Sequence, residues 1–175
     1  YSIFMKYLKS LFTILLISAA ILSCSNEEAS TKPIPENISK ELTIFHINDQ
    51  HGKLDNFSKI KYIIDQEKAQ TNVMVVCSGD IFSGNPVVDN HPQKGFPMID
   101  IMNAVGFDVS VIGNHEFDYG ELILKDRFNQ SNFSWICANV NTSNSNISKP
   151  NAYKTIEVNG LKITFLGLVE TNGKD

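Results

Sequence analysis

Residue types that bind metals follow three separate apolar runs of the sequence. Asp49 and His51 come at and just after the end of ELTIFHIND (41–49), Asp80 ends NVMVVCSGD (72–80), and Asn114 lies in FDVSVIGNHE (107–116). A carboxylate combined with an imidazole suits Zn, Mn or Fe better than Ca, and Asn114 offers a neutral carbonyl oxygen. We therefore expect Asp49, His51, Asp80 and Asn114 to be metal ligands.

The expected site suits two ions and a phosphate. Asp80 follows Gly79, which lets the backbone turn sharply and project the carboxylate. One carboxylate can bridge two metal ions held about 3.5–4 Å apart. Because only Asp49 and Asp80 are charged, two divalent ions would keep about two net positive charges at the site. That local excess would attract a phosphate dianion to a chain whose net charge is −4.

His115 lies beside these ligands without needing to be one. Asp118, three residues later, can accept a hydrogen bond from one ring nitrogen and orient the imidazole. The histidine could then protonate a leaving oxygen or stabilise the phosphoryl oxygens of a transition state. The expected nucleophile is a hydroxide activated by the two metals. We expect His115 and Asp118 to form a catalytic pair.

The elements that must position these residues alternate between strands and helices. This alternation predicts a mostly parallel α/β layer fold, whose ligands gather beyond the carboxyl ends of the strands. One helix, 56–70, is expected to bury Phe57, Ile60, Ile63 and Ile64 on one face. The predicted strands are 41–49, 72–80, 107–116, 133–140, 153–160 and 162–170, and the other helices are 97–106 and 119–130.

Two smaller features complete the expected domain. Asn159–Gly160 is typical of the turn of a hairpin that joins the last two strands. The stretch 141–150 reads as a polar loop. The composition, with 42% hydrophobic and 19% charged residues, indicates one globular domain. The negative net charge argues against binding a nucleic-acid duplex.

The amino-terminal segment has the pattern of a lipoprotein signal peptide, residues 1–24. Lys6 and Lys9 precede an apolar run from Leu11 to Leu22, which is too short to span a bilayer and has no polar face for a core helix. The ending ILSC resembles a bacterial lipobox, so Cys24 is the expected lipidated residue, anchored in a lipid bilayer. Residues 25–40 read as a flexible tether, and 41–175 as the domain.

Several residues have structural explanations. Cys77 and Cys137 are either buried thiols or, outside the cytoplasm, a disulfide. His46, by strand parity, faces away from Asp49 and His51 and is expected to be a hydrogen-bonded structural histidine. His91 is expected in a loop, Trp135 in the core and Glu116 in a structural role near a turn. Turn and capping chemistry could explain each polar cluster singly, but three matching strand ends favour a site.

NDQHG, GDIFSGNP and GNHEFDYG, in this order, resemble the motifs of the 5′-nucleotidase branch of the calcineurin-like metallophosphoesterases. The resemblance runs from about Glu41 to the end of the sequence. It implies a layered αββα catalytic domain that uses two divalent ions (Mn, Zn, Fe or Co) to hydrolyse nucleotide phosphate esters. The same residues carry the implied roles: Asp49, His51, Asp80 and Asn114 as ligands, with Asp80 bridging, and His115 with Asp118 as the catalytic pair.

The sequence departs from this family in one respect. The family completes its two metal sites with a later histidine and a Gly-His-x-His motif, whereas no histidine follows His115 here. We therefore expect the domain to be incomplete at its carboxyl end, and these 175 residues alone to bind metal poorly and not to turn over. The alternative is a non-catalytic envelope lipoprotein that binds a ligand or partner. Base and ester preference, metal identity and oligomeric state stay open.

Overall fold

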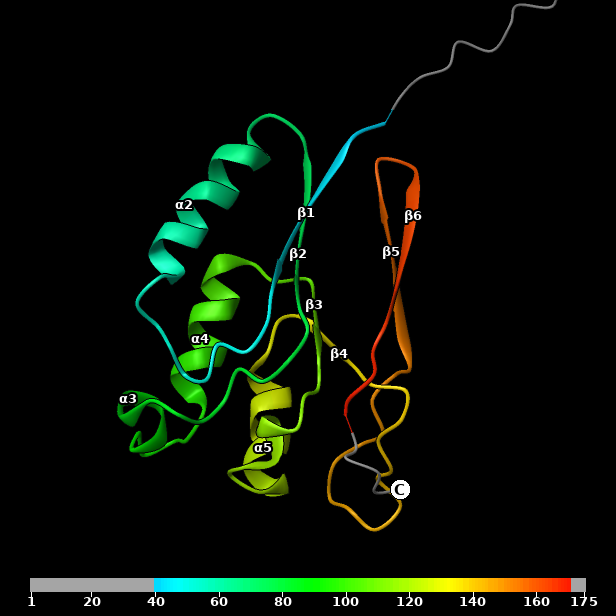
Figure 1. The fold of residues 1–175 in the computed structure, drawn as a ribbon. Coiled ribbons are helices and arrows are strands. Elements are labelled where there is room, and N and C mark those ends of the chain that lie inside the picture. The colour runs from blue at the N-terminus through cyan, green and yellow to red at the C-terminus, as the bar shows by residue number, and fades with distance from the viewer. Residues whose placement is uncertain (1–39, 171–175) are drawn as a thin grey trace, which may run out of the picture. The chain divides into compact units, whose positions relative to one another are not determined.

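The computed structural model describes residues 40–170 as a sheet flanked by helices (Figure 1). The predicted signal peptide, its Cys24, the tether up to residue 39 and the last five residues lie outside the described part. Four parallel strands form the sheet, in the order β1-β2-β3-β4. They are β1 (Leu42–Ile47), β2 (Asn72–Cys77), β3 (Val109–Val111) and β4 (Ser134–Ile136).

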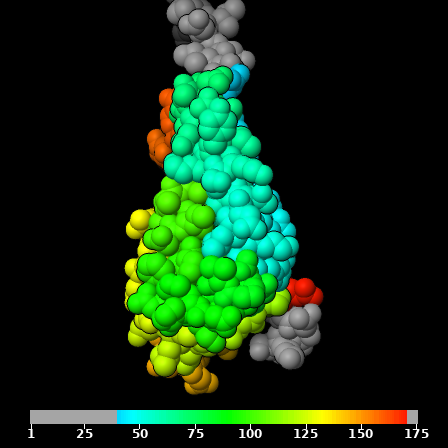
Figure 2. Space-filling view, turned by 90° about the vertical axis from the view of Figure 1, so that its left-hand side faces the viewer, coloured from blue at the N-terminus to red at the C-terminus, as the bar shows by residue number. Residues whose placement is uncertain are grey.

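Helices cover one face of this sheet (Figure 1), and Figure 2 looks onto that helical side. The three long helices follow the first three strands in turn, as the alternating pattern predicts. They are α2 (Phe57–Lys68), α4 (Phe96–Val105) and α5 (Glu121–Gln130); two short helices, α3 (Pro86–Asp89) and η1 (His115–Phe117), were not predicted. Within residues 40–170, no helix is both long and apolar enough to cross a membrane.

Alternation along β2 sends side chains into two separate cores. Val75 and Cys77 pack into the large core under the helices. Val76, between them, packs into a smaller cluster on the opposite face, where Ile156 and Phe165 cover it. This is the period-2 geometry of a strand buried on both faces, and it explains why β2 is continuously apolar after Asn72.

The second face is covered by a hairpin, β5 (Tyr153–Val158) and β6 (Leu161–Leu166). Its predicted turn at Asn159–Gly160 is confirmed, because both residues have positive φ angles, 49° and 70°. The described residues thus form a helical layer, a parallel sheet and a hairpin layer. The predicted α/β fold class is confirmed; a second helical layer of the αββα kind is not among residues 40–170.

The apolar face predicted for 56–70 is only partly confirmed. Phe57 and Ile64 are fully buried and Ile60 packs against the core, but Ile63 is 55% exposed. At 100° per residue, Ile63 lies well off the stripe that joins the other three side chains. The prediction of Ile63 as a core residue is therefore wrong.

The strands end earlier than predicted at the edge where the polar clusters lie. β1 ends at Ile47 and β3 at Val111, instead of residues 49 and 116. The chain then leaves the sheet, and His115–Phe117 forms a single 3₁₀ turn. The polar clusters therefore sit in loops just beyond the strands.

Candidate metal centre

The loops after β1, β2 and β3 meet at the carboxyl edge of the sheet. Because the three strands are parallel neighbours, their loops leave it side by side. Backbone hydrogen bonds continue between the first two loops: Asp49 donates to the Gly79 carbonyl at 3.1 Å and His51 to the Asp80 carbonyl at 3.1 Å. The structure thus brings Asp49 and His51 next to Asp80.

Asp49, His51 and Asp80 all have left-handed backbone conformations, with φ of 52°, 47° and 54°. Non-glycine residues seldom adopt such angles, and they concentrate at functional sites. Asp49 and His51 are therefore not alternate residues of an extended strand. A left-handed turn still brings them together, with His51 Nε2 3.6 Å from Asp49 Oδ1.

The loops after β2 and β3 touch backbone to backbone at two glycines. A Cβ atom on Gly79 would lie 2.6 Å from the Gly113 nitrogen, and one on Gly113 would lie 2.4 Å from Asp80 Oδ1. Asp80 Oδ1 accepts a hydrogen bond from the His115 backbone at 2.9 Å. No side chain larger than hydrogen fits at either glycine, so this close approach holds Asp80 beside His115.

His115 lies at the centre of the cluster. Its ring centroid is 4.6 Å from that of His51, in an edge-to-face arrangement. Its Nδ1 is 2.8 Å from Asp118 Oδ2, the contact expected from their spacing. Asp118 also accepts a hydrogen bond from the Ser83 hydroxyl. Asn114, directly before His115, has an exposed side chain.

The contacts of His115 and Asp118 shift the pKa values of both side chains. The hydrogen bond to Asp118 raises the pKa of His115 above its ordinary value. Partial burial would raise the pKa of Asp118, but hydrogen bonds from Ser83 and His115 outweigh it and lower that pKa. Both shifts favour a protonated imidazole beside an ionised carboxylate.

Glu116 is fully buried behind the cluster. Its carboxylate accepts hydrogen bonds from the backbone of Asp80 at 3.0 Å, Ile81 at 2.8 Å and Gly113 at 2.5 Å. Burial raises its pKa, and the three hydrogen bonds oppose that shift. The sequence indicated only a structural role near a turn. The available signal was a glutamate directly after the Asn-His pair.

Sequence reasoning missed a second group of residues. Ser83 donates its backbone N–H to the Tyr119 hydroxyl at 3.0 Å, and that hydroxyl donates to Asp89. Desolvation and the hydrogen bond to Asp89 raise the pKa of Tyr119 far above its ordinary value. These contacts tie the loop after β2 to the turn that carries Asp118.

The donors fit divalent ions by their chemistry. Carboxylate oxygens from Asp49 and Asp80, the His51 imidazole and the Asn114 amide come from three adjacent loops at one edge, and such mixed N and O sets suit transition metals. Among residues 40–170, however, no three His, Cys, Asp or Glu side chains are grouped closely enough to hold an ion by themselves. Asp49, His51 and Asp80 alone therefore do not form a metal site in this arrangement.

The remaining histidines and cysteines lie apart from this chemistry. His46 Nε2 is 2.7 Å from the Ser78 hydroxyl, and His91 lies in a loop, stacked on Phe96. These interpretations are confirmed, as is Trp135 in the core at 9% exposure. Cys77 and Cys137 are free and buried, so the disulfide alternative is wrong. Burial raises the pKa of Cys77 to about 12.

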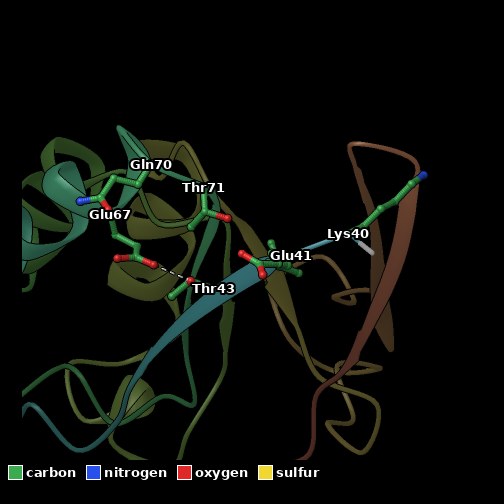
Figure 3. A pocket seen from close by; sticks show the side chains of 7 residues that line it. Lys40, Glu41, Thr43, Glu67, Gln70 and Thr71 are labelled. Atoms are coloured by element: carbon green, nitrogen blue, oxygen red, sulfur yellow. Dashed lines mark hydrogen bonds between the residues drawn. The ribbon is translucent and has the colours of Figure 1, made fainter. Parts of the chain in front are cut away.

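A cleft of about 600 Å³ lies at the other end of the sheet, where β1 begins and α2 ends (Figure 3). The Thr43 hydroxyl donates to Glu67 there at 2.7 Å, and the Lys40 side chain points away from both. The cleft holds none of the predicted ligands. It gives no alternative location for the chemistry expected at the carboxyl edge.

Comparisons with known proteins identify one family. A profile of the calcineurin-like phosphoesterases matches residues 42–173. An endonuclease of Bacillus subtilis is 30% identical over 73% of this chain and 13% of its own length. A 5′-nucleotidase of Vibrio vulnificus is 29% identical over 87% of this chain and 30% of its own length.

A solved structure extends the similarity to the fold. The 5′-nucleotidase precursor of Thermus thermophilus superimposes with a TM-score of 0.65 and 25% identity, over 73% of this chain and 28% of that protein. The chain spans less than a third of the length of each of these proteins.

Proposed function

The chain belongs to the calcineurin-like phosphoesterases, and from this premise we propose that the protein is a metal-dependent hydrolase of nucleotide phosphate esters. The substrate class is a 5′-nucleotide or a 2′,3′-cyclic nucleotide. The observation that carries the proposal is the hydrogen bond between His115 and Asp118, at the same edge as Asp49, His51 and Asp80. A protein that only binds a ligand has little use for an imidazole oriented in this way.

In this proposal Asp49, His51, Asp80 and Asn114 would hold two divalent ions, drawn from Mn, Zn, Fe and Co. Such ions supply positive charge that polarises a phosphate ester and lowers the pKa of water. The protein supplies the arrangement: left-handed turns aim Asp49 and Asp80, and the contact between Gly79 and Gly113 holds the loops together.

His115 acts on the reacting phosphate. Asp118 holds its Nδ1, which leaves Nε2 to donate a hydrogen bond to a phosphoryl oxygen or a proton to the leaving oxygen. The raised pKa of His115 keeps that proton available at higher pH. Asp118 stays ionised and stabilises the imidazolium.

The 5′-nucleotidase relative supports a nucleotide substrate. The endonuclease relative raises polynucleotide cleavage as a second candidate. The net charge of −4 weighs against it, because duplex binding rests mainly on basic side chains that neutralise phosphates.

The test measures phosphate release from 5′-AMP and phosphodiester cleavage of 2′,3′-cyclic AMP by the product of the complete reading frame, with Mn²⁺ and with EDTA. We expect metal-dependent turnover and no cleavage of duplex DNA.

His115→Asn should lower kcat by about 10²-fold or more, the usual contribution of a positioned acid or base. His91→Asn removes a loop histidine and serves as the matched control. Equal kcat values for the two variants would refute the role of His115.

We further propose that the 175 residues alone bind metal weakly and do not turn over. Four donors are few for two ions, each of which takes about four to six ligands, and no three ionisable donors group together among residues 40–170. Purified chain of this length should release no phosphate from 5′-AMP at any Mn²⁺ concentration. Metal-dependent release by that chain would overturn this second proposal and leave the first intact.

A further inference from the structure

Glu116 links the two loops that carry Asp80 and Asn114. Its side chain is 0% exposed, and both carboxylate oxygens accept hydrogen bonds. Oε1 accepts from the Ile81 backbone, and Oε2 accepts from the backbones of Asp80 and Gly113. Two of these donors belong to the loop after β2 and one to the loop after β3, so a single buried side chain joins both loops.

The Glu116 carboxylate supplies hydrogen-bond acceptors where the pairing of β2 with β3 stops. The register of β2 and β3 ends at the pair Cys77–Ser110. Beyond that pair β2 and β3 no longer bond to each other, and the buried N–H groups that follow need other acceptors. Glu116 provides these acceptors at the point where the loops carry the expected ligands.

The link is reciprocal. Glu116, from the loop after β3, accepts from the backbone of the loop after β2. Asp80, from the loop after β2, accepts in return from the His115 backbone at 2.9 Å. Each loop therefore contributes a carboxylate that binds the backbone of the other, which fixes the loops in two places.

We infer that Glu116 is a positioning residue, whose carboxylate sets the separation of Asp80 from Asn114 and thereby the metal affinity of the site. The inference rests on the proposed metal-dependent function. Loss of a residue that orients metal ligands weakens metal binding by about 10- to 100-fold. Because Glu116 is 0% exposed, its effect passes through the loops it binds.

The experiment compares two variants of the complete gene product. Glu116→Gln keeps the shape but turns an N–H₂ group toward backbone donors. Met102→Ala opens a cavity at a fully buried position in α4 and lowers stability without removing any hydrogen bond of the link between the loops. Mn²⁺ affinity is read from the electron paramagnetic resonance signal of free Mn²⁺, at a temperature where both variants are folded. We expect at least a 10-fold weaker affinity for Glu116→Gln and no change for Met102→Ala.

A second measurement needs neither metal nor variant. In the metal-free wild-type protein, NMR couplings across hydrogen bonds should connect the Glu116 carboxylate carbon to the backbone nitrogens of Asp80, Ile81 and Gly113. If no coupling is present and these amides exchange as fast as exposed ones, the inference fails. If the wild-type protein does not bind Mn²⁺, the proposed function fails, while the couplings still report on the link.

Two further results would also overturn the inference. One is equal Mn²⁺ affinity for the wild type and a folded Glu116→Gln. The other is failure of both Glu116→Gln and Glu116→Asp to fold, which would make Glu116 a folding residue only. Glu116→Asp keeps both oxygens but is too short to reach both loops, and it is used if Glu116→Gln does not fold. A 10-fold loss of affinity in folded Glu116→Asp supports the positioning role.

Discussion

Asp49 and His51 meet Asp80 at the carboxyl edge because backbone hydrogen bonds join the two loops and all three residues have left-handed backbone angles. Residue types and spacing were enough to select Asp49, His51 and Asp80 as neighbours. Their left-handed backbone angles were not predictable, because aspartate and histidine adopt such angles only when the surrounding structure imposes them. The contact of Ser83 with Asp118 was also missed, since it joins residues 35 positions apart and no local pattern encodes it.

At the scale of single residues, Asp118→Asn should lower the pKa of His115 toward its ordinary value of 6.5. The variant removes the hydrogen-bonded negative charge that raises this pKa. The measurement is an NMR titration of the His115 ring in metal-free protein. Asp126→Asn, which removes an exposed carboxylate from α5, should leave the pKa of His115 where the wild type has it. Matching titration curves for wild type and Asp118→Asn would contradict the assignment.

The same pair makes the stability of the metal-free fold depend on pH. Because folding raises the pKa of His115, its contribution is fully present below pH 6.5 and is lost as the pH rises through the raised value. Because folding lowers the pKa of Asp118, its contribution is present above pH 3.8 and is lost as the pH falls through the lowered value. The pair therefore stabilises the fold most between these two limits. Asp118→Asn should lower the stability within this window and flatten the profile on either side of it.

At the scale of elements, the strand–helix alternation predicted the parallel sheet and its three long helices. The boundaries at the carboxyl edge were wrong because the deciding contacts are tertiary. β3 stops at Val111, where Gly113 packs against the loop after β2 and Glu116 supplies acceptors to it. The sequence predicted that β3 continues through Gly113 and Asn114, because a single sequence does not show that the loop after β2 packs against them.

The glycine contact between these loops gives a prediction about stability. Gly79→Ala would force a left-handed angle on alanine and press its Cβ against the Gly113 backbone. Gly106→Ala imposes the same kind of angle, but its Cβ would meet only the flexible end of Lys68 at 3.4 Å. We expect Gly106→Ala to lower the free energy of unfolding by about 1 kcal/mol, and Gly79→Ala by about 1–3 kcal/mol more.

Urea unfolding followed by the fluorescence of Trp135, the single tryptophan, measures both variants. Equal losses of stability would show that only the backbone angle matters at Gly79. The close approach of the two loops would then contribute nothing to the stability of the fold.

At the scale of the whole molecule, we propose a lipid-anchored protein of the bacterial cell envelope. The support is the sequence alone: a cationic start, a short apolar run and a lipobox-like ending at Cys24. This segment lies outside the described residues. The proposal accounts for the domain boundary predicted after residue 40, near the start of β1 at Leu42.

Metabolic labelling with an alkyne-tagged palmitate tests this anchor. The wild-type protein should be labelled and should sediment with the membranes, because each buried methylene of an acyl chain contributes about 0.8 kcal/mol to membrane binding. Cys24→Ala should lose both properties, and Cys77→Ala, which alters a buried thiol, should keep them. Labelling that persists in Cys24→Ala would refute the assignment.

The order of the strands has a consequence for how the molecule forms during synthesis. Because β1, β2, β3 and β4 lie in the sheet in the order in which they occur in the chain, each strand that leaves the ribosome can pair with the one made just before it. The pairings join residues about 30 positions apart, such as Leu42 with Asn72, so little of the chain must wait for a distant partner. Asp49, Asp80 and His115 lie in the loops after the first three of these strands, so these residues can come together before β4 pairs.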